Sequence, residues 1–101
     1  MYRGTKNYGG EVVVTFNDVP LDPRLDLFNH PPIGFDWGYS GSGSAQLALA
    51  VLAHHFKDDD RAMKLYQQFK FAVFAGIHKK IKWTLTPTQI DTIVAKIETK
   101  A

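Results

Sequence analysis

Two short segments near the start of the chain are rich in β-branched and aromatic residues, and a polar turn with two glycines separates them. The segments are residues 2–6 and 11–16, and the turn is residues 7–10. This pattern predicts two antiparallel strands. Residues 19–21 follow a second tight turn and predict a short third strand. That strand belongs at a sheet edge, because Pro20 has no backbone N–H to donate.

Three later segments have the pattern of helices. Residues 44–56 are apolar on every face over most of their length, which indicates a helix buried at the centre of the domain. Residues 60–75 repeat apolar side chains with a period of 3.6, and the acids at 58–60 offer an N-cap. A Thr-x-x-Gln capping box begins at Thr86, with Pro87 at the first helical position, and predicts the third helix.

The second helix carries more aromatic side chains than one buried stripe requires. Phe71 falls on the side opposite the stripe, and Phe74 adds a further ring. Rings in such places either cover another element of the fold or contact a second copy of the chain, because a lone domain rarely leaves them exposed. We therefore expect weak self-association as a homodimer.

A long segment without helical periodicity, residues 22–43, joins the strands to the first helix. Its many apolar side chains allow it to pack onto the body of the protein as an ordered loop. The 101 residues suffice for one core. We predict a single domain, residues 1–101, of the α+β class. It has a small antiparallel meander of two to three strands, the ordered loop, and three helices of which the first is central and buried.

The amino-acid composition limits the cellular environment in which we expect the protein and the kinds of site that it can form. The chain has no cysteine, which excludes a disulfide scaffold, a thiolate zinc site and a cysteine nucleophile. No apolar stretch approaches the roughly 20 residues that span a bilayer, and the start lacks the apolar core of a signal peptide. We therefore expect a cytoplasmic protein that contacts no membrane.

Positive charge is concentrated in the last third of the chain. Its densest cluster, Lys79–Lys82, falls in a segment that we place in a loop between helices, where lysines are commonly just solvated. Nucleic-acid binding therefore has no support in this pattern.

A glycine and serine loop leads directly into the first helix and is the most informative feature of the chain. The start of a helix leaves about four backbone N–H groups unpaired and carries a partial positive charge, and glycines let a ligand approach the backbone. We therefore predict an anion site at this junction, with flanking aromatic rings that can stack on a base. The candidate ligand-binding residues are Trp37, Tyr39, Gly41, Ser42, Gly43, Ser44, Gln46 and His30.

The same residues admit a purely structural interpretation. Gly41 and Gly43 allow a tight turn, while Ser42 or Ser44 caps the helix and the rings join the core. If residues 35–39 are extended, the rings at 35, 37 and 39 share one side of the segment. The loop matches neither a Walker motif nor a dinucleotide fingerprint.

The sequence gives less support to an enzyme than to a binding module. A triad can be drawn from His30, Asp36 and one of the loop serines, but Ser42 lacks the Gly-x-Ser-x-Gly spacing of a nucleophile elbow. The adjacent pair His54 and His55 diverges by about 100° on a helix, so it does not form a zinc pair. We predict no catalytic residue, no metal site and no cofactor.

Residues 30–50, together with 21–27, 65–70 and 83–86, resemble the signature of the small-protein family called domain of unknown function 6166, which occurs in bacteria, archaea and phages. Two positions depart from that pattern: Ser40 stands where the family often has glycine, and Ser44 where it often has proline. The likeness covers nearly the whole chain. It implies no activity, because the role of the family is unknown.

We predict a non-enzymatic binding module that holds a small anionic or nucleotide-like ligand at the Gly/Ser loop and the helix start. The resemblance implies a phage or mobile-element setting, in which such a module would sequester a signalling nucleotide as an anti-defence protein. The alternative is a protein-interaction or inhibitor module that uses exposed aromatic rings and the Lys79–Lys82 cluster. A small hydrolase using His30 is the minor alternative.

Overall fold

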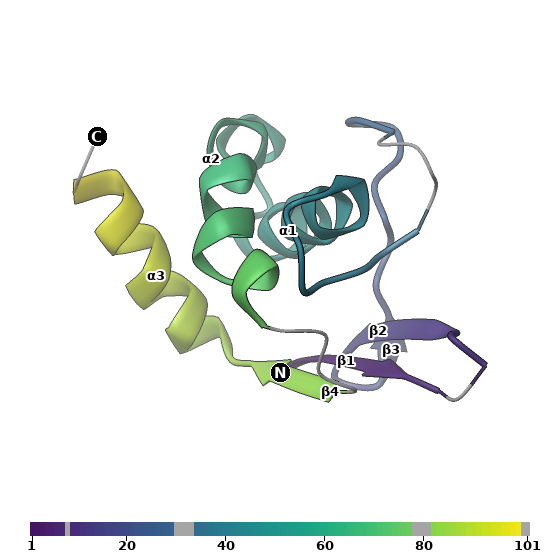
Figure 1. Cartoon of the computed structure of the whole chain (residues 1–101). Helices are drawn as coiled ribbons and strands as arrows, with labels where there is room; N and C mark the ends of the chain where they lie inside the picture. The colour runs from purple at the N-terminus through teal and green to yellow at the C-terminus, as the bar shows by residue number, and fades with distance from the viewer. Residues whose placement is uncertain (8, 30–33, 78–81, 100–101) are drawn as a thin grey trace.

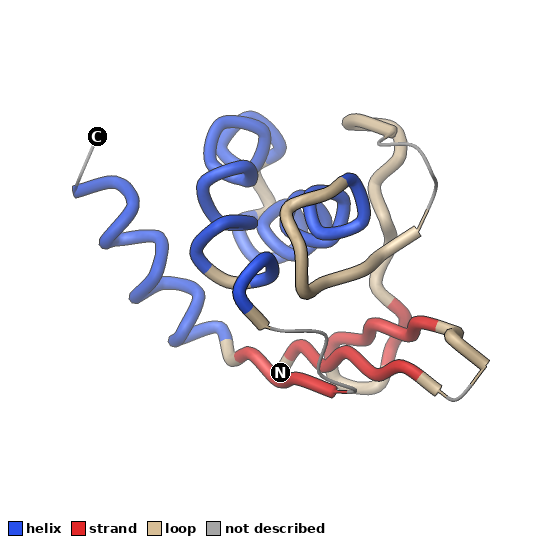
Figure 2. The backbone as a smooth tube through the Cα atoms, viewed as in Figure 1, coloured by secondary structure: helices blue, strands red, loops and turns tan. Residues whose placement is uncertain are grey.

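The computed structural model describes residues 1–7, 9–29, 34–77 and 82–99. These residues form an antiparallel sheet with the helices on one side of it (Figure 1). The other side of the sheet has no helix against it (Figure 2). The fold is therefore of the α+β class, as the pattern predicts.

The sheet has four strands in the order β3-β2-β1-β4. They are β1 (Tyr2–Lys6), β2 (Val12–Phe16), β3 (Val19–Pro20) and β4 (Lys82–Leu85). Short β3 lies at an edge, as Pro20 requires, and β4 forms the other edge by pairing with β1. The prediction placed β4 in a loop between helices, which was wrong. Its partner lies at the far end of the chain, so no local signal marks it.

Side chains alternate between the two faces of β1 and β4. Tyr2 and Trp83 are buried toward the helices, whereas Arg3, Thr5 and Thr84 are exposed on the open face. In the register of the pair, Gly4 lies opposite Trp83. A side chain at Gly4 would collide with the Trp83 indole, so the glycine makes room for this ring in the core.

The first helix, α1 (Ser42–Phe56), is buried at every position from Gly43 to Ala53. It packs mainly against α2 (Asp59–Ala72). This confirms the prediction of a central, buried first helix. The helix begins two residues earlier than predicted.

The other two helices follow their sequence signals closely. Asp58 caps α2 by accepting from the Arg61 N–H. The capping box of α3 (Pro87–Thr99) is complete, because the Thr86 N–H donates to Gln89 Oε1 at 2.8 Å and the Gln89 N–H donates to Thr86 Oγ1 at 3.1 Å.

The end of α2 differs from the prediction. The helix stops at Ala72, and a 3₁₀ turn, η1 (Phe74–Gly76), follows. This turn buries the Phe74 ring against Trp83, with ring centroids 5.0 Å apart. Phe71 remains 62% exposed, so it covers neither the sheet nor the loop. Within the described residues, no helix is both long and apolar enough to cross a bilayer.

Candidate functional site

The loop before α1 turns sharply at Gly38. This residue has a φ of 91°, and its N–H donates to the Phe74 carbonyl at 2.8 Å. The turn sends Trp37 into the core at 0% exposure and leaves Tyr39 45% exposed. The rings at 35, 37 and 39 were expected on one side if the segment is extended. The turn at Gly38 means that this condition is not met, and the rings of Trp37 and Tyr39 have different surroundings.

Helix α1 begins without a side-chain cap. Its N-cap residue is Gly41, and its first turn contains no acid. The Ser44 hydroxyl donates back to the Tyr39 carbonyl at 2.5 Å, so it closes the loop onto the helix and caps no N–H. The interpretation in which Ser42 or Ser44 caps the helix therefore does not hold. The positive end of α1 is left without compensation from its own first turn.

Gly43 is needed for close packing against the loop. A Cβ at this position would lie 2.5 Å from the Asp36 Cβ and 3.0 Å from the Asp36 backbone nitrogen. The glycine thus lets the loop backbone lie directly on the first turn of α1. Because this contact fills the space beside Gly43, a ligand cannot approach from that side.

The Asp36 carboxylate is held by its own neighbours. It accepts from Lys6 Nζ at 2.5 Å and from the Trp37 N–H at 2.8 Å. Burial raises the pKa of this carboxyl, but the hydrogen bonds from Lys6, the Trp37 N–H and Tyr39 outweigh it, so the net pKa lies below its ordinary value. Asp36 is therefore a paired carboxylate and not a general base poised near neutral pH.

Gln46 holds the long loop from inside the protein. Its side chain is fully buried, and its amide Nε2 donates to the carbonyls of Pro23 at 2.6 Å and Phe28 at 3.0 Å. These bonds tie two points of the loop to α1 near its start. The role that the structure shows for Gln46 is structural.

Lys70 is the charged residue at the junction that the sequence analysis missed. It comes from α2 and is only 7% exposed, and its Nζ donates to the Ser40 carbonyl at 3.2 Å. The same ammonium lies 4.2 Å from the centroid of the Phe71 ring. A signal was available, because Lys70 lies four residues after Tyr66 and thus beside the buried stripe.

The predicted ligand residues therefore divide into two groups. Trp37, Gly43, Ser44 and Gln46 are buried and serve the packing of loop and helix. Tyr39, Gly41 and Ser42 remain at the surface, next to Ser40 and the Lys70 ammonium. His30 lies outside the described residues, as do residues 79–81 of the lysine cluster, while Lys82 belongs to β4.

The described part of the chain has no group of three His, Cys, Asp or Glu side chains that could hold a metal ion. His54 accepts or donates a hydrogen bond with the Tyr2 hydroxyl at 2.6 Å, and His55 pairs with Asp91 at 2.6 Å. The two rings thus diverge to different partners, as their adjacency on a helix predicts.

The fold and its junction define a small α+β domain in which a glycine-rich loop is packed onto the start of a buried helix. The chain belongs to the family described as "Family of unknown function (DUF6166)", whose model matches residues 2–96. This confirms the family resemblance. No curated protein and no solved structure matches the chain.

Proposed function

We propose that the protein is a non-enzymatic binding module that takes an anionic, nucleotide-like ligand at the start of α1, where Gly41 and Ser42 are partly exposed. The observation that carries the proposal is the position of Lys70. Lys70 is 7% exposed, and its ammonium donates to the carbonyl of Ser40, beside a helix start that has no side-chain cap and no acid in its first turn.

This arrangement is electrostatically unfavourable in the absence of a ligand. A helix N-terminus carries about half a positive charge and favours anions, yet here a cation lies next to it. The nearby Asp36 carboxylate does not compensate, because Lys6 already pairs with it at 2.5 Å. An anion beside Ser42, the partly exposed first residue of α1, would interact favourably with both the helix end and Lys70.

The surrounding surface fits a ligand that carries a base as well as a phosphate. Tyr39 and Phe71 are 45% and 62% exposed, and both adjoin the Lys70 contacts. Exposed rings can stack on a base, whereas the buried Trp37 cannot, so Tyr39 replaces Trp37 as the proposed stacking residue. A module that binds without converting its ligand is suited to sequestering a signalling nucleotide, including in a phage or mobile element.

Thermal denaturation with a panel of phosphates, nucleotides and cyclic nucleotides tests this proposal. Wild-type protein should melt at a higher temperature with at least one anion, because a ligand at about 100 times its Kd adds about 2.7 kcal/mol of stability. Lys70→Met should abolish that shift, since methionine keeps the buried stem and removes the charge. Lys64→Met, on the exposed surface of the same helix, is the matched control and should keep it.

The proposal fails if no member of the panel shifts the melting temperature of the wild type. An equal shift in the Lys70→Met variant would also contradict it. The Gly43→Val variant is a poor probe of binding, because its new side chain would collide with Asp36 and disturb the fold itself.

A second candidate, a protein-interaction module, is favoured by the exposure of Phe71. This ring is 62% exposed on α2 and has the Lys70 ammonium across its face, and Tyr39 is exposed on the same junction. Self-association through this surface would appear as a mass above that of the monomer in sedimentation at high protein concentration. The Phe71→Ser variant should then be monomeric, and a monomeric wild type would contradict the dimer.

A further inference from the structure

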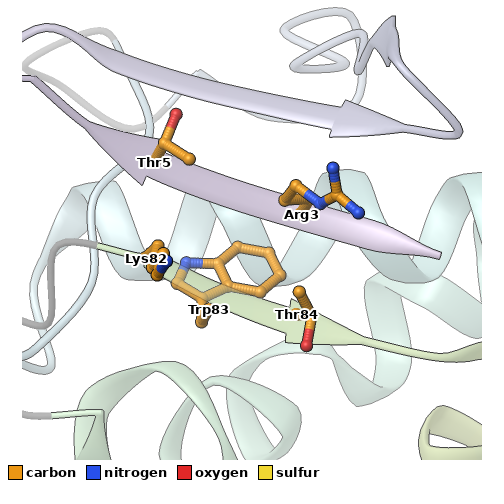
Figure 3. Close-up of a pocket in the computed structure, with 5 residues that line it drawn as sticks. All are labelled: Arg3, Thr5, Lys82, Trp83 and Thr84. Atoms are coloured by element: carbon orange, nitrogen blue, oxygen red, sulfur yellow. The ribbon is translucent and has the colours of Figure 1, made fainter.

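A hollow of about 550 Å³ lies on the open face of the sheet, between β1 and β4. Its lining consists of Arg3 and Thr5 from β1 with Lys82, Trp83 and Thr84 from β4 (Figure 3). A volume of this size is within the range of small-molecule sites. The hollow is remote from the start of α1, because the sheet itself separates the open face from the helices (Figure 2).

The register of the two strands sets the two cations at a defined spacing. Arg3 lies opposite Thr84, and Thr5 lies opposite Lys82. Arg3 and Lys82 are therefore diagonal neighbours, whose Cα atoms are about 7–8 Å apart in an antiparallel pair. Long side chains at this spacing can converge on one group between them, while the two threonines supply hydroxyls at the remaining corners.

Little of the cationic charge is neutralised by the protein. Within the described residues Arg3 pairs with Asp18 at 4.0 Å, and that aspartate side chain is 92% exposed to solvent. A contact at this distance between exposed groups is weak. Lys82 has no ion pair within the part of the chain that the structure describes.

The side chains that face the hollow are hydrogen-bond donors. Arginine and lysine can only donate, and the threonine hydroxyls can donate as well. The Trp83 indole takes no part in this, because its ring packs toward the helices against Phe74 and is buried there.

We propose that this hollow is a second binding site, which takes a small ligand rich in hydrogen-bond acceptors, namely one that carries a phosphoryl group. Arg3 and Lys82 supply the charge, and the hydroxyls of Thr5 and Thr84 orient the oxygens. The proposal does not depend on the function proposed for the start of α1, because the two sites share no residue.

Nuclear magnetic resonance tests the site directly. Inorganic phosphate and adenosine monophosphate are titrated into isotope-labelled protein, and the backbone amide shifts of β1 and β4 are followed. We expect saturable shifts centred on residues 3–5 and 82–84. Arg3→Gln and Lys82→Gln should each weaken binding about tenfold, as the loss of one charge-assisted hydrogen bond implies.

Two control variants distinguish binding in this hollow from general charge attraction and from binding at the start of α1. Lys64→Gln removes the same charge from the exposed surface of α2 and should leave the affinity unchanged, and Lys70→Met should also leave the shifts of β1 and β4 unchanged. An equal loss in Lys64→Gln would show general charge attraction and overturn the site. Non-saturable shifts would overturn it as well.

A final titration distinguishes a site for a small ligand from a surface that binds a polynucleotide. A short single-stranded oligonucleotide is titrated under the same conditions. If its affinity rises steeply with length and greatly exceeds that of the mononucleotide, the open face is a nucleic-acid surface and the small-ligand proposal is wrong. Comparable affinity per phosphate supports the proposal.

Discussion

Helices α1 and α3 begin in opposite ways. The start of α3 is exposed and satisfies its own backbone through the reciprocal bonds of Thr86 and Gln89. The start of α1 has Gly41 as its N-cap and is held instead by contacts with the preceding loop. The difference shows that local caps stabilise a helix at the surface, whereas packing of the preceding chain fixes a central helix whose own first turn supplies no cap and no acid.

The largest effect is expected where α1 depends on burial. Leu49 is 0% exposed, so Leu49→Ala should lower the free energy of unfolding by about 2–5 kcal/mol through lost apolar contact and a residual cavity. Ile97 of α3 is only partly buried, so Ile97→Ala should have a clearly smaller effect. Chemical denaturation measures both. A loss below about 1 kcal/mol for Leu49→Ala would show that α1 is not the centre of the core.

The next effect concerns the contact between loop and helix. Gly43→Val should destabilise the protein by about 1–3 kcal/mol, because the new side chain would press on Asp36 and displace the loop. Gly76→Ala is the matched control, since a Cβ there meets nothing within 4 Å. Thermal or urea unfolding distinguishes the two. Equal stability of both variants would mean that the loop does not need its close approach to α1.

The difference between the starts of α1 and α3 is tested directly by removing one hydroxyl from each. Thr86→Ala should destabilise the protein by about 1 kcal/mol, because it removes the side-chain acceptor from the cap of α3. Ser42→Ala should change stability by less than about 0.5 kcal/mol, because no described cap bond depends on that hydroxyl. If the two variants lose equal stability, α1 relies on a serine cap after all.

The smallest effect comes from supplying the acid that the first turn of α1 lacks. Ser42→Asp should raise stability by about 0.3–1 kcal/mol, since a carboxylate interacts favourably with the helix end and with nearby Lys70. The same variant should bind anions more weakly, because the new carboxylate occupies their place. Ser42→Asn is the uncharged control. Unchanged anion affinity in Ser42→Asp would contradict a site at this junction.

The parts of the fold that could be predicted are those encoded by neighbouring residues. Asp58 and Thr86 mark helix starts because an N-cap acts within three residues, and the apolar run of α1 indicates burial by itself. Strand β4 could not be predicted, because its four residues become a strand only by pairing with β1. Its short sequence is equally compatible with a loop.

The sequence located the junction of loop and helix, but it identified only some of the side chains that surround it. The Gly/Ser pattern located the junction, but it could not show which side chains face outward, because Gly38 turns the chain between Trp37 and Tyr39. Lys70 could not be found at all from the loop, since it arrives from another helix. The hollow beside β4 was missed for the same reason as β4 itself.

The pairing of β1 with β4 has a consequence for how the chain folds. Residues 2–5 are bonded to residues 82–85, so the pairing of edge strand β4 with β1 closes a loop that contains both α1 and α2. Closing so long a loop costs conformational entropy that local contacts do not offset. Contacts between residues far apart in the sequence therefore slow folding. During synthesis, the hairpin of β1 and β2 can form early. One edge of strand β1 then remains unpaired until β4 has left the ribosome. During that interval β1 is the segment most open to pairing with another chain.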